Sequence, residues 1–302
     1  MYDKDFSVII PHRDSVSLLA KLFASIPVSE KIEVILVDNS PIPVSREMIG
    51  VNRDYQLLYS APERGAGGAR NVGIEHAHGK WLIFADADDY FTEDAFDTFL
   101  SMKDTKAEIV FTCMGGVYLD TGERSSRGDK FTLMVKGYLA GIRSEMSLRL
   151  GFSSPCCKMI SHDLVRREHI QFDEVKASND VYFSLLTGYY AKTIEAIDKI
   201  SYIATVSRGT LTQRRDLSVV EARFRVKLRY NQFVKNHGYP NHQKSIMNQV
   251  RQIVGFGPRV WLHFGWLLIQ YRQNPLVGWR NWMRTWSKVV KQDKKDKRYI
   301  VK

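Results

Sequence analysis

Three carboxylates lie within four positions at the end of a short apolar run. Residues 81–85 predict a buried strand, and Asp86, Asp88 and Asp89 follow it at once. Carboxylates at this spacing repel one another unless a cation lies between them. Mg²⁺ and Mn²⁺ favour oxygen ligands, usually one or two carboxylates with the phosphates of a substrate. The Asp-x-Asp pair therefore predicts a metal and diphosphate site, although the cluster also fits a solvated acidic turn before a helix near Thr92.

The chain before this cluster contains the elements that would position it. One apolar strand stops at Pro11, and a second ends at Asp38. A glycine-rich loop at 65–68 then runs into a helix. Ligands of open α/β sheets bind beyond the carboxyl ends of the strands, which is where the acidic cluster lies. The glycine spacing does not match the dinucleotide-binding fingerprint, and this disfavours a Rossmann dehydrogenase.

Strand and helix patterns alternate along the first part of the chain. Such alternation predicts an α/β fold with a mostly parallel sheet and helices on both faces. Residues 114–150 give weaker signals, and the polar stretch 120–130 with Gly115 and Gly116 favours a loop. The expected strands are 6–11, 32–38, 55–59, 80–86 and 107–113, and the expected helices are 16–26, 71–78 and 92–102.

Four short motifs occur in an order that one family shares. They are Ser-Val-Ile-Ile-Pro at 7–11, Val-Asp-Asn-Ser at 37–40, Ala-Arg-Asn-Val-Gly at 69–73 and Asp-Ala-Asp-Asp at 86–89. Together they resemble the nucleotide-sugar-binding half of the family 2 glycosyltransferases, and the resemblance covers about residues 5 to 215. It implies a GT-A fold with a nucleotide-sugar-binding half at 1–104 and an acceptor-binding half at 105–215. A helical, basic and tryptophan-rich extension, 216–302, would follow.

The resemblance implies a site for a UDP-sugar. Asp38 is expected to accept the imide N–H of uracil, although it also fits a turn before Asn39 and Ser40. The other side of the base would be lined by Pro11, His12, Arg13 and Asp14. The family more often has Pro-x-Tyr-Asn at these positions, so His12 or Arg13 would stack on the base in place of the tyrosine.

The resemblance also assigns the groups around the diphosphate. Arg70 and Arg208 are expected to reach the nucleotide or its phosphates, and for both the alternative is an exposed arginine without such a role. Asp86 would touch the ribose or the metal, and Asp88 would ligate a Mn²⁺ or Mg²⁺ cofactor. That metal would stabilise the charge of the departing nucleoside diphosphate. Asp89 is expected to brace the turn or cap the next helix.

A general base is expected in the acceptor half. Inverting glycosyl transfer needs a group that takes the proton of the acceptor hydroxyl. Asp180 matches the family's catalytic aspartate, whereas Asn179 replaces the usual glutamate. Ser178 fits an N-cap, which would place Asp180 in the first turn of a helix. The alternative is an acid that only complements the helix dipole.

Charge is distributed unevenly along the chain. The net charge is +11, yet residues 223–302 carry 18 Lys and Arg against two acids, which gives +16. Residues 1–222 carry 26 Lys and Arg against 31 Asp and Glu, which gives −5. Five of the six tryptophans also lie in 223–302. This asymmetry points to a membrane surface or a nucleic acid, and the lack of an upstream nucleic-acid motif disfavours the second.

The basic region ends in a pattern typical of an interfacial helix. At about 100° per residue, one arc collects apolar side chains and another collects cations. The alternative is a helix that packs its tryptophans on the catalytic domain. The apolar arc holds Leu276, Trp279, Trp282, Met283, Trp286, Val289 and Val290, and the basic arc holds Arg280, Arg284, Lys288, Lys291 and Lys295.

The remaining composition bears on the compartment. Cys113, Cys156 and Cys157 form no Cys-x-x-Cys pair and no even framework, which disfavours a disulfide scaffold or a zinc site. No charged-then-apolar leader opens the chain, and the longest apolar stretch, 260–269, is too short to span a bilayer. We therefore expect a cytoplasmic protein that is peripheral on the inner face of the cell membrane.

These observations lead to one main functional hypothesis. The chain is expected to be an inverting, metal-dependent glycosyltransferase that moves a sugar from a UDP-sugar to a glycan or lipid-linked glycan in surface polysaccharide synthesis. Its expected partners are the donor, the acceptor and an anionic membrane surface, with no nucleic acid. The alternative is a non-catalytic nucleotide-sugar-binding subunit of a glycan assembly complex, which Asn179 and the altered Pro-His-Arg-Asp segment motivate.

Overall fold

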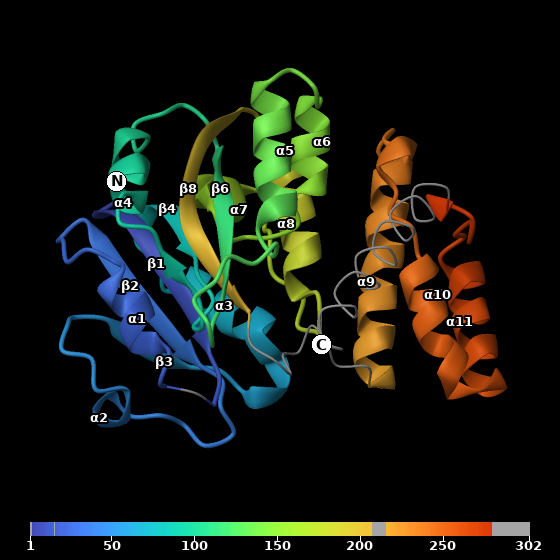
Figure 1. Cartoon of the computed structure of the whole chain (residues 1–302), viewed down its shortest axis with the longest axis horizontal. Helices are drawn as coiled ribbons and strands as arrows, with labels where there is room; N and C mark the ends of the chain where they lie inside the picture. Colours follow the sequence, from blue (N-terminus) through green and yellow to red (C-terminus); the bar gives the residue numbers. More distant parts are fainter. Residues whose placement is uncertain (1, 15, 207–215, 280–302) are drawn as a thin grey trace, which may run out of the picture. The chain divides into compact units, whose positions relative to one another are not determined.

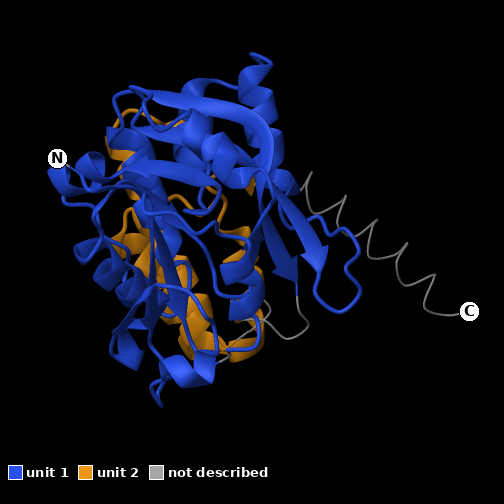
Figure 2. Ribbon diagram, turned by 90° about the vertical axis from the view of Figure 1, so that its left-hand side faces the viewer, with its two compact units in different colours: residues 1–213 blue, residues 214–302 orange. Residues whose placement is uncertain are grey.

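The computed structural model describes residues 2–14, 16–206 and 216–279. The chain divides into two compact units, Met1–Gln213 and Arg214–Lys302 (Figure 2). They are called here the first and the second unit. The further division of the first unit at residue 104 stays a prediction.

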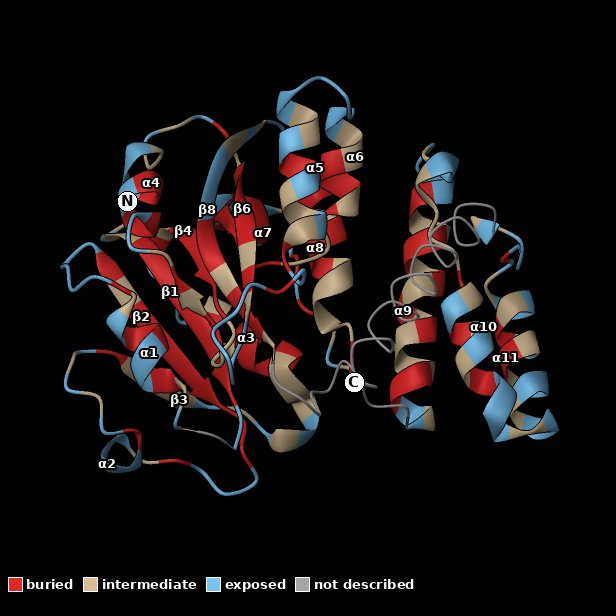
Figure 3. Ribbon diagram, viewed as in Figure 1, coloured by how far each residue is buried: buried red, intermediate tan, exposed pale blue. Residues whose placement is uncertain are grey.

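The amino-terminal half of the first unit builds a parallel sheet. Its strands are β1 (Lys4–His12), β2 (Ile32–Asp38), β3 (Gln56–Tyr59) and β4 (Gly79–Phe84), in the order β3-β2-β1-β4 (Figure 1). The inner strands β1, β2 and β4 are apolar runs buried along most of their length (Figure 3), as is typical of parallel strands. His12 lies opposite Asp38, and Ile9 lies opposite Phe84, so the carboxyl ends of β1, β2 and β4 meet at one edge.

The other half of the sheet is mixed. β7 (Lys158–Ser161) pairs antiparallel with both β4 and β6 (Ile109–Tyr118), while β8 (Ile194–Val206) runs parallel to β6. The short β5 (Tyr90–Phe91) closes the edge antiparallel to β8. The expected α/β fold with a helix-flanked sheet is therefore confirmed, with antiparallel pairs at β7 and β5 that periodicity did not reveal.

Helices connect these strands. The amino-terminal half contains α1 (Leu19–Ala24), α2 (Arg46–Ile49), η1 (Pro62–Arg64), α3 (Gly65–Glu75) and α4 (Ala95–Ser101). The rest of the first unit contains α5 (Asp129–Leu139), α6 (Glu145–Gly151), α7 (His162–Arg167) and α8 (Asn179–Tyr190). Figure 1 shows α5 and α6 side by side near β6. The three cysteines are buried and unpaired.

The loop expected at 120–130 is confirmed up to Gly128, whereas the expectation is wrong for Gly115 and Gly116. β6 continues through Gly115 and Gly116 to Tyr118, and α5 begins at Asp129. A Cβ at Gly115 would come 2.6 Å from Cδ1 of Ile203 on the neighbouring strand β8. The glycine therefore lets a β8 side chain pack across β6. From the sequence alone, glycine is a residue that usually interrupts a strand, so this packing role could not be recognised.

The glycine-rich segment is part of a helix and not a loop, contrary to expectation. α3 begins at Gly65, and its glycines serve close packing. A Cβ at Gly67 would lie 2.0 Å from the carbonyl oxygen of Asp173, and one at Gly73 would lie 2.4 Å from Cγ2 of Ile9. These contacts bring α3 onto β1 and onto the segment that leads to α8.

The second unit is helical, as expected. It contains α9 (Leu217–Asn236), η3 (Pro240–His242), α10 (Met247–Ile253), η4 (Val254–Phe256) and α11 (Pro258–Gln270). A separate small core joins these helices through Val220, Phe224, Leu228, Ile246, Ile253, Phe264 and Leu267. Among the described residues, no helix is long and apolar enough to cross a membrane. The predicted amphipathic helix with Trp282 and Trp286 falls mostly beyond residue 279, outside the described residues.

Candidate functional site

The acidic cluster lies directly after β4. The cluster consists of Asp86, Asp88 and Asp89. Each can offer one carboxylate oxygen, and these three oxygens lie within 4.8 Å of one another. Asp86 and Asp88 are partly exposed, whereas Asp89 is buried. Because Ile9 pairs with Phe84, Asp86 lies at about the level of Pro11 on the neighbouring strand. The cluster is therefore at the edge where the parallel strands end.

Asp89 is held by two residues of β8. The hydroxyl of Tyr202 donates to Asp89 Oδ2 at 2.8 Å, and the backbone N–H of Thr205 donates to Oδ1 at 2.7 Å. The Tyr202 hydroxyl also accepts from the backbone N–H of Asp86 at 2.8 Å, and the Thr205 hydroxyl donates to the carbonyl of Asp88 at 2.7 Å. Asp89 thus braces the turn, as expected, while Asp86 and Asp88 remain partly exposed. Sequence analysis did not point to Tyr202 or Thr205.

The charges of the cluster suit a cation. Burial and the charge of Asp86 raise the pKa of Asp88 above its usual value. Burial, with the charges of Asp86 and Asp88, raises the pKa of Asp89 further, against the hydrogen bonds from Thr205 and Tyr202. A divalent ion between the carboxylates would remove this repulsion, and oxygen donors are the ligands that Mg²⁺ and Mn²⁺ favour. The residues present therefore fit the expected metal.

Arg70 connects the cluster to the start of α8. Its Nη2 donates to Asp86 Oδ1 at 2.5 Å, and its Nη1 donates to Asn179 Oδ1 at 2.8 Å. The guanidinium carbon also lies 5.2 Å from the ring centroid of Phe172. Burial lowers the pKa of Arg70, but the charges of Asp86 and Asp180 outweigh it and leave the pKa above its usual value. Arg70 therefore stays charged although its side chain is only 6% exposed.

Asp180 lies in the first turn of α8, as expected, and is half-buried. The preceding Ser178 occupies the N-cap position but does not cap the helix. Its φ is +62°, in the left-handed region, and its side chain makes no capping hydrogen bond. A capping serine normally has extended dihedrals, so sequence type alone was misleading here. Left-handed backbone at a serine costs energy and is common beside functional groups.

Three basic side chains interact electrostatically with Asp180. The carboxylate acts on the pKa values of Arg70, Lys130 and Lys158. Lys158, on β7, is fully buried and donates from Nζ to the carbonyl of Phe152 at 2.8 Å. Burial lowers the pKa of Lys158 to about 7, while Cys157 and Asp180 oppose the shift. Lys158 is a third residue that sequence analysis missed, because nothing in its local pattern marks burial.

Asp38 and His12 form a buried pair at the ends of β2 and β1. His12 Nδ1 lies 2.9 Å from Asp38 Oδ1, and both residues are 1% exposed. The Ser40 hydroxyl and backbone N–H also donate to Oδ1, and the Val44 N–H donates to Oδ2. Burial raises the pKa of Asp38, but these bonds from Ser40, Val44 and His12 outweigh it and leave the pKa lowered. The carboxylate is ionised and fixed, and its role toward a base stays a prediction.

The residues after Pro11 lie beside the end of β2. Asp14 has a φ of +65°, and its backbone N–H donates to the Ser40 hydroxyl at 2.8 Å. Arg13 is exposed and donates to the carbonyl of Pro62 at 3.2 Å. Pro11, His12 and Asp14 are thus brought beside Asp38 and Ser40. Arg208 lies outside the described residues.

The segment before α8 is fastened to α3. The Asn71 side chain donates to the carbonyl of Phe172 at 3.0 Å and accepts from its N–H at 2.8 Å. Arg64 binds both carboxylate oxygens of Glu174, at 3.0 and 2.6 Å. These bonds, with the close approach at Gly67, fix the path of the chain toward Asn179 and Asp180. The Ala-Arg-Asn motif therefore has a structural task at Asn71 beside the predicted binding task at Arg70.

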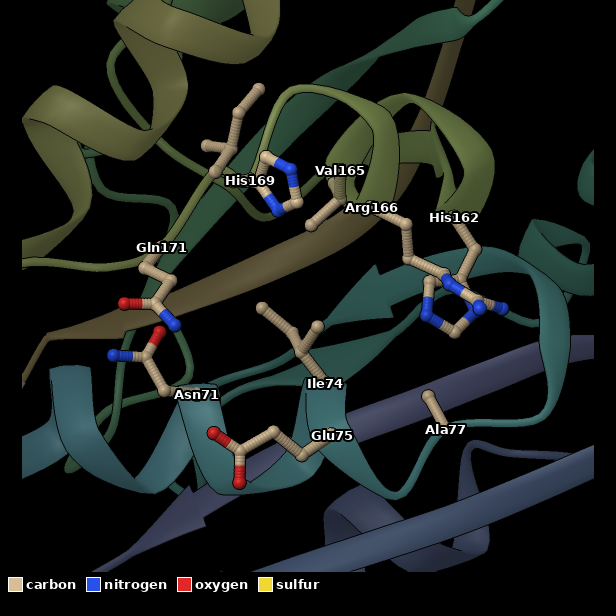
Figure 4. Close-up of a pocket in the computed structure, with 10 residues that line it drawn as sticks. Asn71, Ile74, Glu75, Ala77, His162, Val165, Arg166, His169 and Gln171 are labelled. Atoms are coloured by element: carbon tan, nitrogen blue, oxygen red, sulfur yellow. The ribbon is translucent and has the colours of Figure 1, made fainter.

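A separate hollow of about 590 Å³ lies between α3 and α7 (Figure 4). Figure 4 shows Asn71, Ile74 and Glu75 on one side and His162, Val165 and Arg166 on the other. None of the predicted donor, metal or base residues lines it. The hollow is therefore not the space beside the acidic cluster.

The mixed sheet, with an acidic cluster after a parallel strand, is the arrangement expected of a GT-A fold. Residues 7–168 match the family described as Glycosyl transferase family 2, and the chain belongs to this family. The suspected resemblance is therefore confirmed.

Curated relatives and solved structures agree with this assignment. EpsH of Bacillus subtilis, a putative glycosyltransferase by its description, is 22% identical over 64% of this chain and 58% of its own. The poly(ribitol-phosphate) beta-N-acetylglucosaminyltransferase TarS of Staphylococcus aureus is 24% identical over 68% of this chain and 36% of its own. The chain thus spans about a third to three fifths of these relatives. ExoW of Rhizobium meliloti, a succinoglycan biosynthesis protein, is 22% identical over 82% of this chain and 88% of its own.

Among solved structures, TarS 1–349 from S. aureus in complex with UDP-GlcNAc superimposes with a TM-score of 0.59. It is 21% identical, and the match covers 77% of this chain and 67% of TarS 1–349. At this identity the likeness establishes the fold.

Proposed function

We propose that this chain is an inverting, metal-dependent glycosyltransferase that uses a UDP-sugar. One observation carries the proposal: Arg70 bonds both Asp86, in the acidic cluster, and Asn179, beside Asp180. The predicted metal ligands and the predicted base therefore belong to one site. TarS, which has been solved with UDP and with UDP-GlcNAc, supports a UDP-sugar donor and hexosyl or N-acetylhexosaminyl transfer.

Each side chain then has a task in transfer. Asp86 and Asp88 would hold Mn²⁺ or Mg²⁺, which when bound stabilises the negative charge of the departing diphosphate. Asp180 takes the proton of the acceptor hydroxyl as its oxygen attacks the anomeric carbon. Arg70 orients Asp86 and supplies positive charge close to the diphosphate. Asp38, with His12, presents a fixed carboxylate toward the base, and Arg208 would add charge to the phosphates.

The acceptor is proposed to be a glycan or lipid-linked glycan of a surface polysaccharide. The descriptions of TarS and ExoW support this, since they name a poly(ribitol-phosphate) beta-N-acetylglucosaminyltransferase and a succinoglycan biosynthesis protein. A site at the inner face of the cell membrane would bring the enzyme to lipid-linked acceptors, and the +16 charge of residues 223–302 supports such a place.

Product analysis tests this function. The full chain is incubated with Mn²⁺, a panel of UDP-sugars and lipid-linked glycan acceptors, and the products are examined by mass spectrometry. We expect one acceptor to gain one sugar mass, with release of UDP. Tight UDP-sugar binding with neither transfer nor hydrolysis over the panel would instead favour the non-catalytic binding subunit. A lack of any UDP binding, with or without metal, would contradict both.

A further inference from the structure

Helix α11 is apolar on nearly all sides. Among its residues, Pro258–Gln270, the single charged side chain is that of Arg259. One arc packs inward: Phe264 and Leu267 are buried, and the Phe264 ring lies 4.7 Å from that of Phe224 on α9. His263 Nε2 also lies 3.1 Å from Glu221 Oε1 on α9. This arc accounts for the attachment of α11 to its own unit.

The opposite arc of α11 is equally apolar. Trp261, Leu262, Trp266 and Ile269 are 46%, 75%, 54% and 77% exposed. At about 100° per residue, these four side chains span an arc of about 140°. A helix that is hydrophobic all round is normally buried on both sides, so this arc requires a cover. We call these four residues the outer face of α11.

The exposed apolar surface continues on either side of α11. Val254 and Phe256 precede it, and Leu276 and Trp279 follow it, all exposed. The stretch 254–279 therefore holds eight of the twenty exposed large hydrophobic side chains in the described part of the chain. Single exposed apolar residues are normal, whereas such a concentration marks an interaction surface.

Charge indicates what covers this surface. Residues 222–292 contain no aspartate or glutamate, and Arg251, Arg259 and Arg272 are exposed around α11. Docking of a second copy through the same face would place like charges opposite one another, which is unfavourable. An anionic lipid surface supplies both an apolar layer for the rings and negative charge for the arginines.

We propose that the outer face of α11 docks into an anionic bilayer interface, with the helix in the plane of the membrane. The inference deepens the membrane location in the proposed function and rests on it. It assigns docking to Trp261, Leu262, Trp266 and Ile269, before the tryptophans beyond residue 279. Amphipathic helices bind in this way through aromatic and aliphatic side chains, with basic residues near the head groups.

The test compares two double variants of the full chain. Leu262→Gln with Ile269→Gln changes the outer face, and Val28→Gln with Ile42→Gln changes two equally exposed residues of the first unit, 82% and 81% exposed. Co-sedimentation is measured with phosphatidylglycerol-rich and with phosphatidylcholine vesicles, at low and high salt. All four positions are exposed, so both variants should fold, which circular dichroism and thermal unfolding verify.

We expect the outer-face variant to lose at least tenfold in binding to anionic vesicles, and the control variant to bind like the original chain. Salt should weaken binding of the original chain because charge attraction is screened. Equal binding of the outer-face variant overturns the proposal, as does an original chain that stays in the supernatant. A dimer of the original chain that the outer-face variant abolishes would assign the face to a second copy.

Titration of the same samples with UDP and Mn²⁺ separates the two ideas. Vesicle binding without UDP binding contradicts the proposed enzyme and leaves the docking face standing. UDP binding and sugar transfer without vesicle binding would support the proposed enzyme and contradict the docking face.

Discussion

Arg70 donates to Asp86 and to Asn179 with two different nitrogens of one guanidinium, at 2.5 and 2.8 Å. Asp86 follows β4 and Asn179 begins α8, so one buried side chain joins segments that are far apart in the sequence. The planar fork of arginine suits two acceptors at fixed positions, whereas lysine is a single point charge. Asn179, in place of the family's glutamate, leaves the charge of Arg70 balanced by fewer carboxylates.

Arg70→Lys should therefore reduce function while charge is retained. We expect sugar transfer to fall at least tenfold and UDP affinity to weaken, because one ammonium cannot hold Asp86 and Asn179 together. Arg64→Lys is the matched control, since Arg64 also binds a carboxylate in a fork but is 36% exposed and does not touch the acidic cluster. Equal losses in both variants would show that Arg70 has only a general structural role.

Asp88→Ala should abolish the metal-dependent part of UDP binding. Asp88 is a partly exposed carboxylate of the cluster and is not used to brace the turn. Calorimetric titration with UDP, with and without Mn²⁺, measures the effect. Glu93→Ala, at an exposed acid a few residues on, is the control and should leave the Mn²⁺ enhancement unchanged. Persistence of the enhancement in Asp88→Ala would remove Asp88 from the metal site.

Asp180→Asn should separate binding from chemistry. The amide keeps the size of the side chain and its hydrogen bonding but cannot accept a proton at neutral pH. We expect UDP-sugar affinity close to that of the original chain and transfer slowed by about a hundredfold or more. Single-turnover measurement at saturating donor reads the chemical step directly. Transfer at an undiminished rate would exclude Asp180 as the base.

Sequence patterns predicted the donor half of the fold well. The runs at 6–11 and 32–38 became β1 and β2 because continuous β-branched and apolar residues fit strands buried on both faces. The order of motifs also identified the family, and Asp86, Asp88 and Arg70 converge on one edge as the motifs predicted. Local pattern sufficed here because parallel strands bring their carboxyl ends together.

Other parts depend on contacts that no local pattern encodes. Gly65 to Gly68 suggested a loop, but Gly67 lies within α3. A glycine is needed there because a Cβ would collide with the carbonyl of Asp173, about a hundred residues later in the sequence. Tyr202 and Thr205 brace Asp89 from β8, which belongs to the other half of the sheet. Serine is a residue type that often caps helices, but Ser178 has a left-handed backbone and makes no capping hydrogen bond. Each depends on tertiary packing.

Gly67→Ala should test that packing. The added methyl group would overlap the carbonyl oxygen of Asp173 at 2.0 Å, and backbone cannot move aside as a flexible side chain can. We expect destabilisation of about 1–3 kcal/mol, the usual cost of overpacking, and slower transfer because the segment before Asp180 is displaced. Gly255→Ala is the control, because its Cβ would meet nothing within 4 Å. Thermal unfolding that is unchanged in Gly67→Ala would contradict the close approach.

Lys158 gives the chain a pH-dependent stability. Its ammonium is buried between the rings of Phe111 and Phe152, 5.1 and 4.7 Å from their centroids, and its pKa falls from 10.5 to about 7. Between these two pKa values the unfolded chain holds a proton on Lys158 that the folded chain does not. The free energy of unfolding therefore gains about 1.4 kcal/mol per pH unit from this residue as pH rises through that window. Below pH 7 both states are protonated and the contribution is constant.

Lys158→Met should remove this gain. The buried cysteines also change stability at alkaline pH, because burial raises their pKa values, but they are common to both proteins. The difference between the original chain and the variant therefore isolates Lys158. Urea unfolding across the window from about pH 7 to pH 10 should show the original chain gaining stability relative to Lys158→Met, whereas the exposed Lys106→Met should run parallel to the original. A constant difference between the original chain and Lys158→Met would mean that Lys158 stays charged in the fold, and the cations around Asp180 would then number one more at neutral pH.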